Sequence, residues 1–561
     1  MCGYVFVSSI KKSIRPIDPK LLEHRGPDFT AEVNLGWCRF RHWRLSIQDL
    51  NSGSNQPYSK GYNHLIYNGE IYDYHDLGLS RFSKNFDSDT QLLFYCLTNN
   101  LFDLIKNESG FYSFVFIKES QKQFFASRDE FGKKPLYYYF DKDLLIIASE
   151  DRAVRDIARE YDKLVPLNPL SIAHYFQYKD LHFGSTFYRG IQELAPGSNL
   201  DFDFENWNLS ESRSWEDYYY TIPFYKREIS NKEKSKFSPS DLKKSIVASI
   251  EKRFIADVPV QLALSGGVDS TLVALVAHNK KRSFDRALTV CSSRTTSERV
   301  KSRHLCEEFG LSQKVIDFDA IDVLDLLRAC IKAQGGPVSH PHSLAVFSLT
   351  KEAAQKGKVL VTGEGADELM YGYRHYADNK STFAFLEHLA PSQYFDSAGT
   401  ARIDSSDASW WHKYYEHNDC RDLDVKTHLL SLLRRNDRIA MRNSVEIRSA
   451  FLDFQLFQMV VLHQESGVLP KGKKFLFDFI HESHRGYKVD EKKIGFYVPF
   501  DSWFESQIKH NSKLNKYIEN ANNFFDTKFE WKLKTNVDLT GKLAWVMLNI
   551  GLFLDLEGEI K

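Results

Sequence analysis

The residues with the clearest chemistry are Leu-Ser-Gly-Gly-Val-Asp-Ser at 264–270, where a run of apolar residues ends and a helical pattern begins. Glycines such as Gly266 and Gly267 let main-chain amides approach an anion closely. Such amides, together with the N-terminus of a helix, bind phosphate. Asp269 fits among phosphate oxygens when it binds a cation such as Mg²⁺. The stretch predicts a phosphate-binding loop, and the competing interpretation is an ordinary glycine-rich turn between a strand and a helix.

A second, acidic loop follows another apolar run, in Val-Leu-Val-Thr-Gly-Glu-Gly-Ala-Asp-Glu at 359–368. Ligands of doubly wound parallel sheets bind at the carboxyl ends of the strands. We therefore expect Gly363, Glu364, Gly365 and Asp367 to lie on the same rim as Asp269. Taken alone, the loop is equally well explained as a helix N-terminus with favourable acidic residues.

The N-terminal region holds donors and carboxylates in a series of turns. These are His-Arg-Gly-Pro-Asp at 24–28, Arg-Leu-Ser-Ile at 44–47, Asn-Gly-Glu-Ile-Tyr at 68–72 and Ser-Asp-Thr-Gln at 88–91. Arginine suits the α-carboxylate of a free amino acid, and glutamate or aspartate suits its α-ammonium. Cys2 precedes them and has three interpretations: part of a targeting segment, a buried cysteine, or a nucleophile exposed when Met1 is removed. No positive charge precedes the apolar run after Cys2, which argues against a signal peptide.

Two different patterns of elements must position these groups. Residues 1–205 alternate short aromatic and β-branched runs with turn residues, which predicts a β-rich domain with few helices. Residues 206–240 are polar and poor in aliphatic side chains, and we interpret them as a connector. From 241 onward strands alternate with helices, which predicts a parallel, doubly wound sheet. The chain after about 380 is predicted to be mainly helical.

Composition limits the partners of the chain. Its 561 residues include 74 Lys+Arg and 74 Asp+Glu, so no basic excess predicts a nucleic-acid partner. Its seven cysteines are dispersed without metal-ligand spacing, which fits a reducing cytoplasm. No stretch approaches about 18 uninterrupted apolar residues, so we expect a cytoplasmic protein without a membrane partner.

Taken together, these motifs resemble one family. The series Met-Cys-Gly, His-Arg-Gly-Pro-Asp, Asn-Gly-Glu-Ile-Tyr, Ser-Gly-Gly-Val-Asp-Ser, Gly-Glu-Gly-Ala-Asp-Glu and Lys-Lys-Ile-Gly-Phe stands in the family's order. The chain resembles the glutamine-hydrolysing asparagine synthetase B family, which are class II, N-terminal-nucleophile (Ntn) glutamine amidotransferases. The resemblance runs nearly end to end and implies an α/β fold. Residues 1–205 would form an αββα Ntn-hydrolase glutaminase sandwich, and 241–561 a doubly wound ATP-pyrophosphatase domain with a helical C-terminal part.

The resemblance also implies roles for residues of the first domain. Cys2 would be the glutaminase nucleophile, with its own α-amine as general base because an α-amine titrates near neutral pH. Asn68 and Gly69 would form the oxyanion hole. The glutamine-binding residues would be Arg44, Asn68, Gly69, Glu70 and Asp89.

In the second domain, the resemblance implies an ATP site with bound Mg²⁺. The ATP-binding residues would be Leu264, Ser265, Gly266, Gly267, Asp269, Ser270, Val290, Thr362 and Gly363. Asp269 and Asp367 would bind Mg²⁺. Glu364 would flank the reacting acyl group, and Lys493 would neutralise charge near the α-phosphate, with Lys492 as the alternative.

The implied reaction joins the two sites. Cys2 would release ammonia from glutamine, and the ammonia would pass through an internal tunnel to attack an ATP-activated carboxylate, an acyl-adenylate. Aspartate is the favoured acceptor. His340 and His342 lie in the acceptor region, 335–347, and are explained either as loop histidines or as contacts to a different acid, such as a uronic-acid sugar. A non-catalytic family member is a further alternative, and a homodimer is left open.

Overall fold

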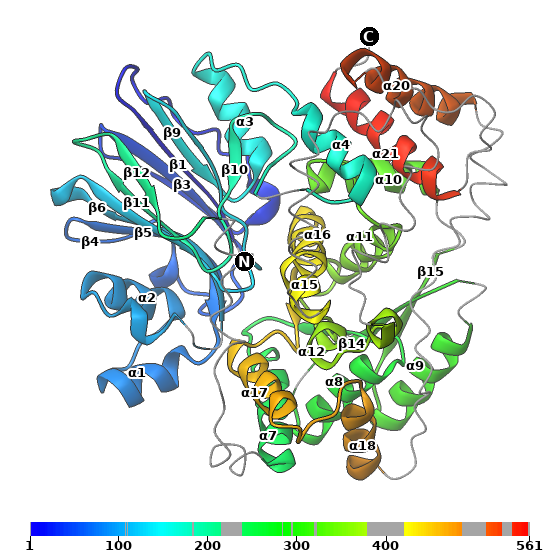
Figure 1. The fold of residues 1–561 in the computed structure, drawn as a ribbon. Coiled ribbons are helices and arrows are strands. Elements are labelled where there is room, and N and C mark those ends of the chain that lie inside the picture. Colours follow the sequence, from blue (N-terminus) through cyan, green and yellow to red (C-terminus); the bar gives the residue numbers. More distant parts are fainter. Residues whose placement is uncertain are drawn as a thin grey trace.

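The computed structural model describes residues 2–106, 108, 110–181, 184–214, 238–282, 284–292, 296–318, 322–378, 420–484, 512–529 and 541–558. The N-terminal strands gather on one side of the molecule, and the helix-flanked second sheet lies beside them (Figure 1). Helix α16 (His428–Arg442) runs between these two halves.

Two six-stranded antiparallel sheets form the N-terminal half. The first has the order β10-β8-β9-β1-β3-β2, and the second has the order β12-β11-β7-β6-β5-β4. The strands of the first sheet are β1 (Cys2–Ser9), β2 (Phe29–Asn34), β3 (Cys38–Arg44), β8 (Tyr137–Phe140), β9 (Leu144–Ala148) and β10 (Ile191–Glu193). Those of the second are β4 (Tyr58–Lys60), β5 (Asn63–Ile71), β6 (Gly110–Lys118), β7 (Gln123–Arg128), β11 (Asn199–Asp203) and β12 (Asn208–Glu211).

Strand β1 explains the apolar run that follows Cys2. Tyr4 and Phe6 point into the core between the two sheets, whereas Val5 and Val7 pack in the cluster that holds the buried side of α3 (Asp151–Glu160). Successive side chains of a strand face opposite sides, so a strand covered on both faces is apolar throughout.

Helices complete two further layers. Helices α1 (Tyr74–Phe82) and α2 (Asp89–Thr98) cover the second sheet, and α3 covers the first sheet. The expected αββα sandwich is confirmed.

The second half is built on a parallel sheet of five strands in the order β15-β14-β13-β16-β17. Its strands are β13 (Val260–Ala263), β14 (Arg286–Cys291), β15 (Gln313–Asp317), β16 (Val359–Thr362) and β17 (Glu446–Ser449). Buried side chains of α7 (Pro239–Lys252) and α8 (Val268–Asn279) pack on one face. Side chains of α11 (His342–Ala353) and α16 pack on the other. The predicted doubly wound sheet is confirmed.

Further helices described in this half, besides the two at its C-terminal end, are α9 (Thr296–Phe309), α10 (Val323–Gln334), α12 (Ala366–Met370), α15 (Cys420–Lys426), α17 (Phe454–Glu465) and α18 (Lys474–Ser483). Strand β17 was not anticipated, because its Glu446 and Arg448 are charged although both are buried. Strand β12 pairs with β11 and lies within 206–240, the range that we interpret as a connector.

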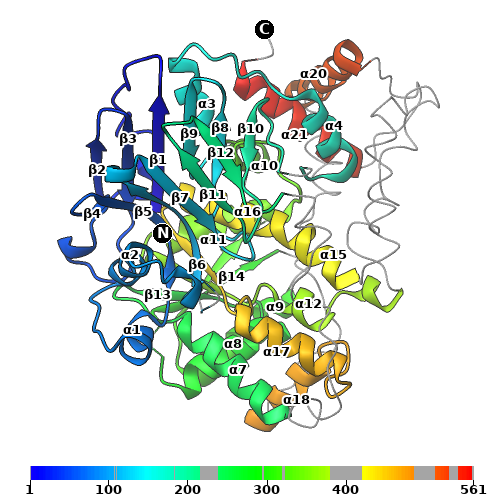
Figure 2. The same cartoon turned by 60° about the vertical axis from the view of Figure 1, so that its left-hand side comes forward.

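The C-terminal helices α20 (Ser512–Phe529) and α21 (Gly541–Glu557) pack on the N-terminal half. The rings of Phe176 in α4 (Pro169–Tyr178) and Phe525 lie 4.9 Å apart, and those of Phe187 and Phe553 lie 5.2 Å apart. Both views place α4 beside α20 and α21 (Figures 1 and 2). None of the helices that the structure describes is long and apolar enough to cross a membrane.

Candidate functional site

The first candidate site surrounds Cys2, which is buried at the start of β1. Its main-chain nitrogen donates a hydrogen bond of 3.0 Å to Oδ1 of Asn68 in β5. The side-chain Nδ2 of Asn68 is also buried, and it has no hydrogen-bond partner among the described residues. A buried amide donor without a partner is costly unless something accepts from it. The geometry therefore leaves one donor beside Cys2 for an oxygen that arrives with a ligand.

Gly69 lies next in β5, opposite Tyr112 of β6. A Cβ atom at Gly69 would lie 2.2 Å from the carbonyl oxygen of Phe111, so no other residue fits. The close approach of these strands explains why the sequence has glycine beside Asn68.

Glu70 is buried at the junction of the two halves. Burial raises the pKa of Glu70 to about 8, against the opposing effect of Arg448 in β17 and with the added repulsion of Glu446. The carboxylate and the Arg448 guanidinium are 3.6 Å apart. Glu70 is therefore largely protonated at neutral pH and is poised to ionise when a cationic ligand arrives.

Asp89 and Arg44 are both buried near this site, where Asp89 accepts hydrogen bonds from its neighbours and Arg44 donates them to a loop. Oδ2 of Asp89 accepts hydrogen bonds from the Ile71 amide (3.1 Å) and the Tyr67 hydroxyl (3.0 Å). Arg44 directs its terminal nitrogens to oxygens of the 48–55 loop, including the Asn55 side chain at 2.8 Å. Arg44 thereby orders that loop, and among the described residues its Nε has no acceptor and can donate to a ligand.

The second candidate site lies where strand order reverses in the parallel sheet. Strands β13 and β16 are neighbours although β14 and β15 separate them in the chain, and such a switch point is the usual ligand site. The two predicted loops follow these two strands. A Cβ atom at Gly363 would lie 2.9 Å from Cβ of Asp269, so the loops touch. Gly266 has φ +76°, a conformation that favours glycine.

A pocket of about 330 Å³ opens between the loops. Most of the predicted ATP and metal residues line it, namely Leu264, Ser265, Gly267, Asp269, Ser270, Val290, Gly363, Glu364 and Asp367. Gly266 in the first loop and Thr362 at the end of β16 do not line it. His342 lines the pocket as well, and the ring of His340 packs against the ring of His342 with 4.1 Å between the centroids and a tilt of 47°.

Lys473 joins the two predicted metal ligands. Its ammonium lies 2.6 Å from Oδ2 of Asp269 and 2.7 Å from Oδ1 of Asp367. Burial alone lowers the pKa of Lys473, but the two carboxylates raise it above its usual value. The spot between Asp269 and Asp367 thus holds a positive charge in this structure. The lysine expected to neutralise charge near the α-phosphate, Lys493 or alternatively Lys492, lies outside the described residues.

Glu364 is held by α16. Arg435 donates to its Oε1 at 2.9 Å, and the Asn436 side chain donates to Oε2. Burial raises the pKa of Glu364, and Arg435 opposes that rise. Sequence reasoning missed Lys473, Arg435 and Asn436. The signal available for the last two was a run of polar residues, Arg-Arg-Asn-Asp-Arg at 434–438, inside an otherwise apolar helix.

Comparison with known proteins supplies the family. The asparagine synthase family model matches residues 241–533, and the glutamine amidotransferase domain model matches residues 1–215. The glutamine-hydrolysing asparagine synthetase 1 of Bacillus subtilis is 23% identical over 93% of this chain and 89% of its own length.

Two other relatives match less of the chain. Asparagine synthetase 3 of Bacillus subtilis is 24% identical over 78% of this chain and 76% of its own. Amidase chry2 of Gibberella zeae is 26% identical over 67% of this chain and 57% of its own. The family models span both candidate sites, and the chain belongs to the asparagine synthase family as a glutamine-dependent amidotransferase.

Proposed function

We propose that the protein makes asparagine from aspartate, with glutamine as the nitrogen donor and ATP as the activating substrate. The observation that carries the proposal is the pocket at the switch point, where the phosphate-type loop and the acidic loop meet. Relatives that are named asparagine synthetases, one of which matches 93% of the chain, support the choice of acceptor.

The glutaminase half uses Cys2 after Met1 is removed. The Cys2 α-amine takes the thiol proton, and Sγ attacks the amide carbon of glutamine. Oδ1 of Asn68 accepts a hydrogen bond from the Cys2 main-chain nitrogen and thereby orients it, while Nδ2 of Asn68 donates to the oxyanion. The carbon–nitrogen bond breaks, ammonia leaves with the proton, and water then hydrolyses the thioester to glutamate.

Substrate glutamine is held by the charged groups around Cys2. The ionised carboxylates of Glu70 and Asp89 receive its α-ammonium. Arg44 acts on the α-carboxylate mainly through the 48–55 loop that it orders, with Nε as its remaining donor.

In the synthetase half, the β-carboxylate of aspartate attacks the α-phosphorus of ATP and pyrophosphate leaves. Ammonia attacks the resulting acyl-adenylate, and AMP leaves. Lys473 offsets the charge that builds up on the phosphates. Glu364 is a buried carboxylate with a raised pKa, and it accepts the proton that the attacking nitrogen must lose.

The donor set at Asp269 and Asp367 fits Mg²⁺, because two carboxylates already share one cation there. The described residues contain no group of three or more His, Cys, Asp or Glu side chains arranged to hold a metal ion. Phosphate oxygens of the substrate would therefore complete the coordination, as is common for Mg²⁺. Mg²⁺ held by Asp269 and Asp367 would supply positive charge to the pyrophosphate leaving group.

The test is pyrophosphate release by the full chain with glutamine and ATP, comparing aspartate with a panel of uronates and other carboxylates. The proposal predicts release with aspartate that exceeds release with every other acid. Pyrophosphate release with a uronate but not with aspartate would identify the uronate as the acceptor. No pyrophosphate release with any of the acids would contradict the assignment as a ligase.

A further inference from the structure

A buried arginine supports the main chain at Cys2. Nε of Arg25, in the 3₁₀ turn η1 (Glu23–Arg25), donates to the carbonyl oxygen of Cys2 at 3.1 Å. A Cβ atom at Gly3 would lie 3.2 Å from both Cβ and Cδ of Arg25, so the arginine side chain packs directly on the strand. Arg25 therefore fixes the peptide that follows the nucleophile.

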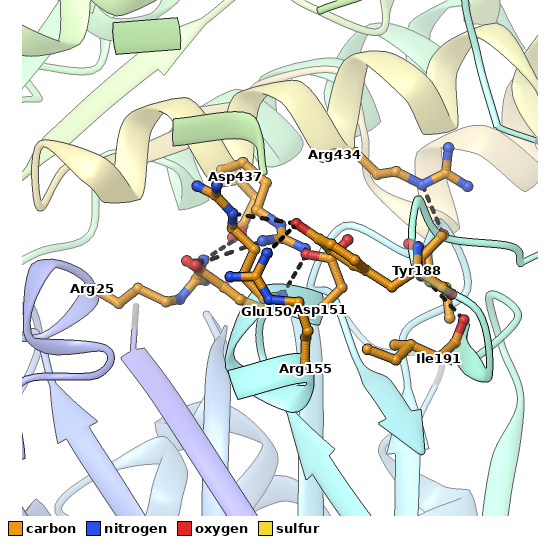
Figure 3. Close-up of polar contacts among 12 residues, drawn as sticks. Arg25, Glu150, Asp151, Arg155, Tyr188, Ile191, Arg434 and Asp437 are labelled. Carbon is orange, nitrogen blue, oxygen red and sulfur yellow. Dashed lines mark hydrogen bonds and ion pairs between the residues drawn. The ribbon is translucent and has the colours of Figure 1, made fainter. Parts of the chain in front are cut away.

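The far end of Arg25 is shared between the two halves of the chain (Figure 3). Its Nη1 lies 3.1 Å from Glu150, the residue before α3, and 2.8 Å from Asp437 in α16. All three side chains are buried. Burial lowers the pKa of Arg25, but Asp437 first and Glu150 second raise it above its usual value. The charge of Arg25 is thus stabilised in part by Asp437, which belongs to the C-terminal half of the chain.

Asp437 directly follows the residues that hold Glu364. Along α16, Arg435 and Asn436 contact Glu364 at the ATP pocket, and Asp437 contacts Arg25 beneath Cys2. Three consecutive residues of one helix therefore reach both candidate sites.

We propose that Asp437 is a positioning residue for glutamine hydrolysis, contributed by the half of the chain that carries the ATP pocket. It holds Arg25, and through Arg25 it holds the Cys2 main chain in the geometry that the nucleophile needs. The inference rests on the proposed role of Cys2 and not on the identity of the acceptor.

The same helix offers a matched control. Arg434 is buried and crosses the same interface, where it pairs with Glu193 at 2.8 Å and Asp180 at 3.2 Å. Glu193 in turn binds Arg128, and neither carboxylate contacts Arg25. Loss of Arg434 removes a buried interdomain ion pair and leaves the support of Cys2 intact.

The experiment measures glutamine hydrolysis without ATP in wild type, Asp437→Asn and Arg434→Gln, with ATP affinity as the second readout. Misplacing a reacting group by about 1 Å costs on the order of a hundredfold in rate. We expect Asp437→Asn to lower kcat by at least about tenfold, with KM and ATP affinity within about twofold of wild type. Arg434→Gln should keep kcat within about threefold.

Arg25→Lys keeps a cation for Asp437 but removes the Nε donor, so it should lower kcat as Asp437→Asn does even where the latter folds poorly. Unchanged kcat in a folded Asp437→Asn or Arg25→Lys would overturn the proposal. An equal loss in Arg434→Gln, or a parallel loss of ATP affinity, would overturn it too by indicating a general interface role. Absence of hydrolysis by wild type would instead overturn the proposed role of Cys2, and this inference with it.

Discussion

Glutamine binding should tighten as pH rises toward 8, because Glu70 must ionise to receive the α-ammonium. Burial raises the pKa of Glu70 to about 8 in the free protein. With that value, about one site in eleven carries an ionised Glu70 at pH 7, and about one in two at pH 8. The apparent affinity scales with the competent fraction, so it should rise about fivefold over this interval.

The same ionisation equilibrium of Glu70 determines whether protons are taken up or released when glutamine binds. Glutamine binds the ionised carboxylate, so binding at pH 7 should release close to one proton for each glutamine bound. The release should fall to about half a proton at pH 8. Burial also raises the pKa of Asp89, whereas Arg448 holds the pKa of Glu446 below its usual range despite its burial. The released proton is therefore shared between Glu70 and Asp89, with Glu446 ionised throughout.

The assay is titration calorimetry of glutamine into Cys2→Ala, which cannot turn the ligand over. Measurement in buffers of different ionisation enthalpy gives the number of protons released, and Glu70→Gln provides the matched control without the titrating group. Affinity that stays constant between pH 6 and 8, with no proton released, would refute the account of Glu70.

Three further predictions concern the two reaction centres. Cys2→Ala should abolish glutamine hydrolysis and keep pyrophosphate release driven by added ammonium salt, and loss of both activities would contradict the assignment. Lys473→Met leaves Asp269 and Asp367 facing each other without a cation. The free energy of unfolding of the apo protein, measured by thermal denaturation, should therefore fall by about 3 kcal/mol, and Mg²⁺ should restore part of it. Unchanged stability would contradict the contact of Lys473 with both carboxylates. Gly363→Ala places a Cβ atom 2.9 Å from Cβ of Asp269. ATP-dependent pyrophosphate release should therefore fall about tenfold or more, while the rate of glutamine hydrolysis stays within about twofold of wild type. Equal losses in both assays would contradict the separation of the two sites.

The sequence anticipated the parts of the site that local backbone geometry dictates. Gly266 and Gly365 have φ of +76° and +93°, so both loops need glycine and display it in the sequence. The apolar run of β1 is visible because the strand is covered on both faces. Alternation of strands and helices then predicts the doubly wound sheet, whose topology brings the two loops together.

Contacts between distant segments left no local pattern. Lys473 pairs with Asp269, which lies 204 residues earlier, and the lysine-rich run that holds it is typical of a solvated surface. Arg25 and Asp437 come from opposite halves, and each alone is an ordinary charged residue in a turn or a helix. The pKa of Glu70 depends on its burial beside Arg448 and Glu446 of β17. The charged residues of β17 do not give the apolar pattern by which a buried strand is predicted.

The most direct test of the central claim follows the nitrogen atom itself. The full chain is incubated with amide-¹⁵N-glutamine, ATP and aspartate, and the products are analysed by mass spectrometry together with AMP. The account predicts ¹⁵N in the side-chain amide of asparagine, in an amount equal to the AMP formed. Label that appears only as free ammonia, or asparagine formed with ADP in place of AMP, would contradict it.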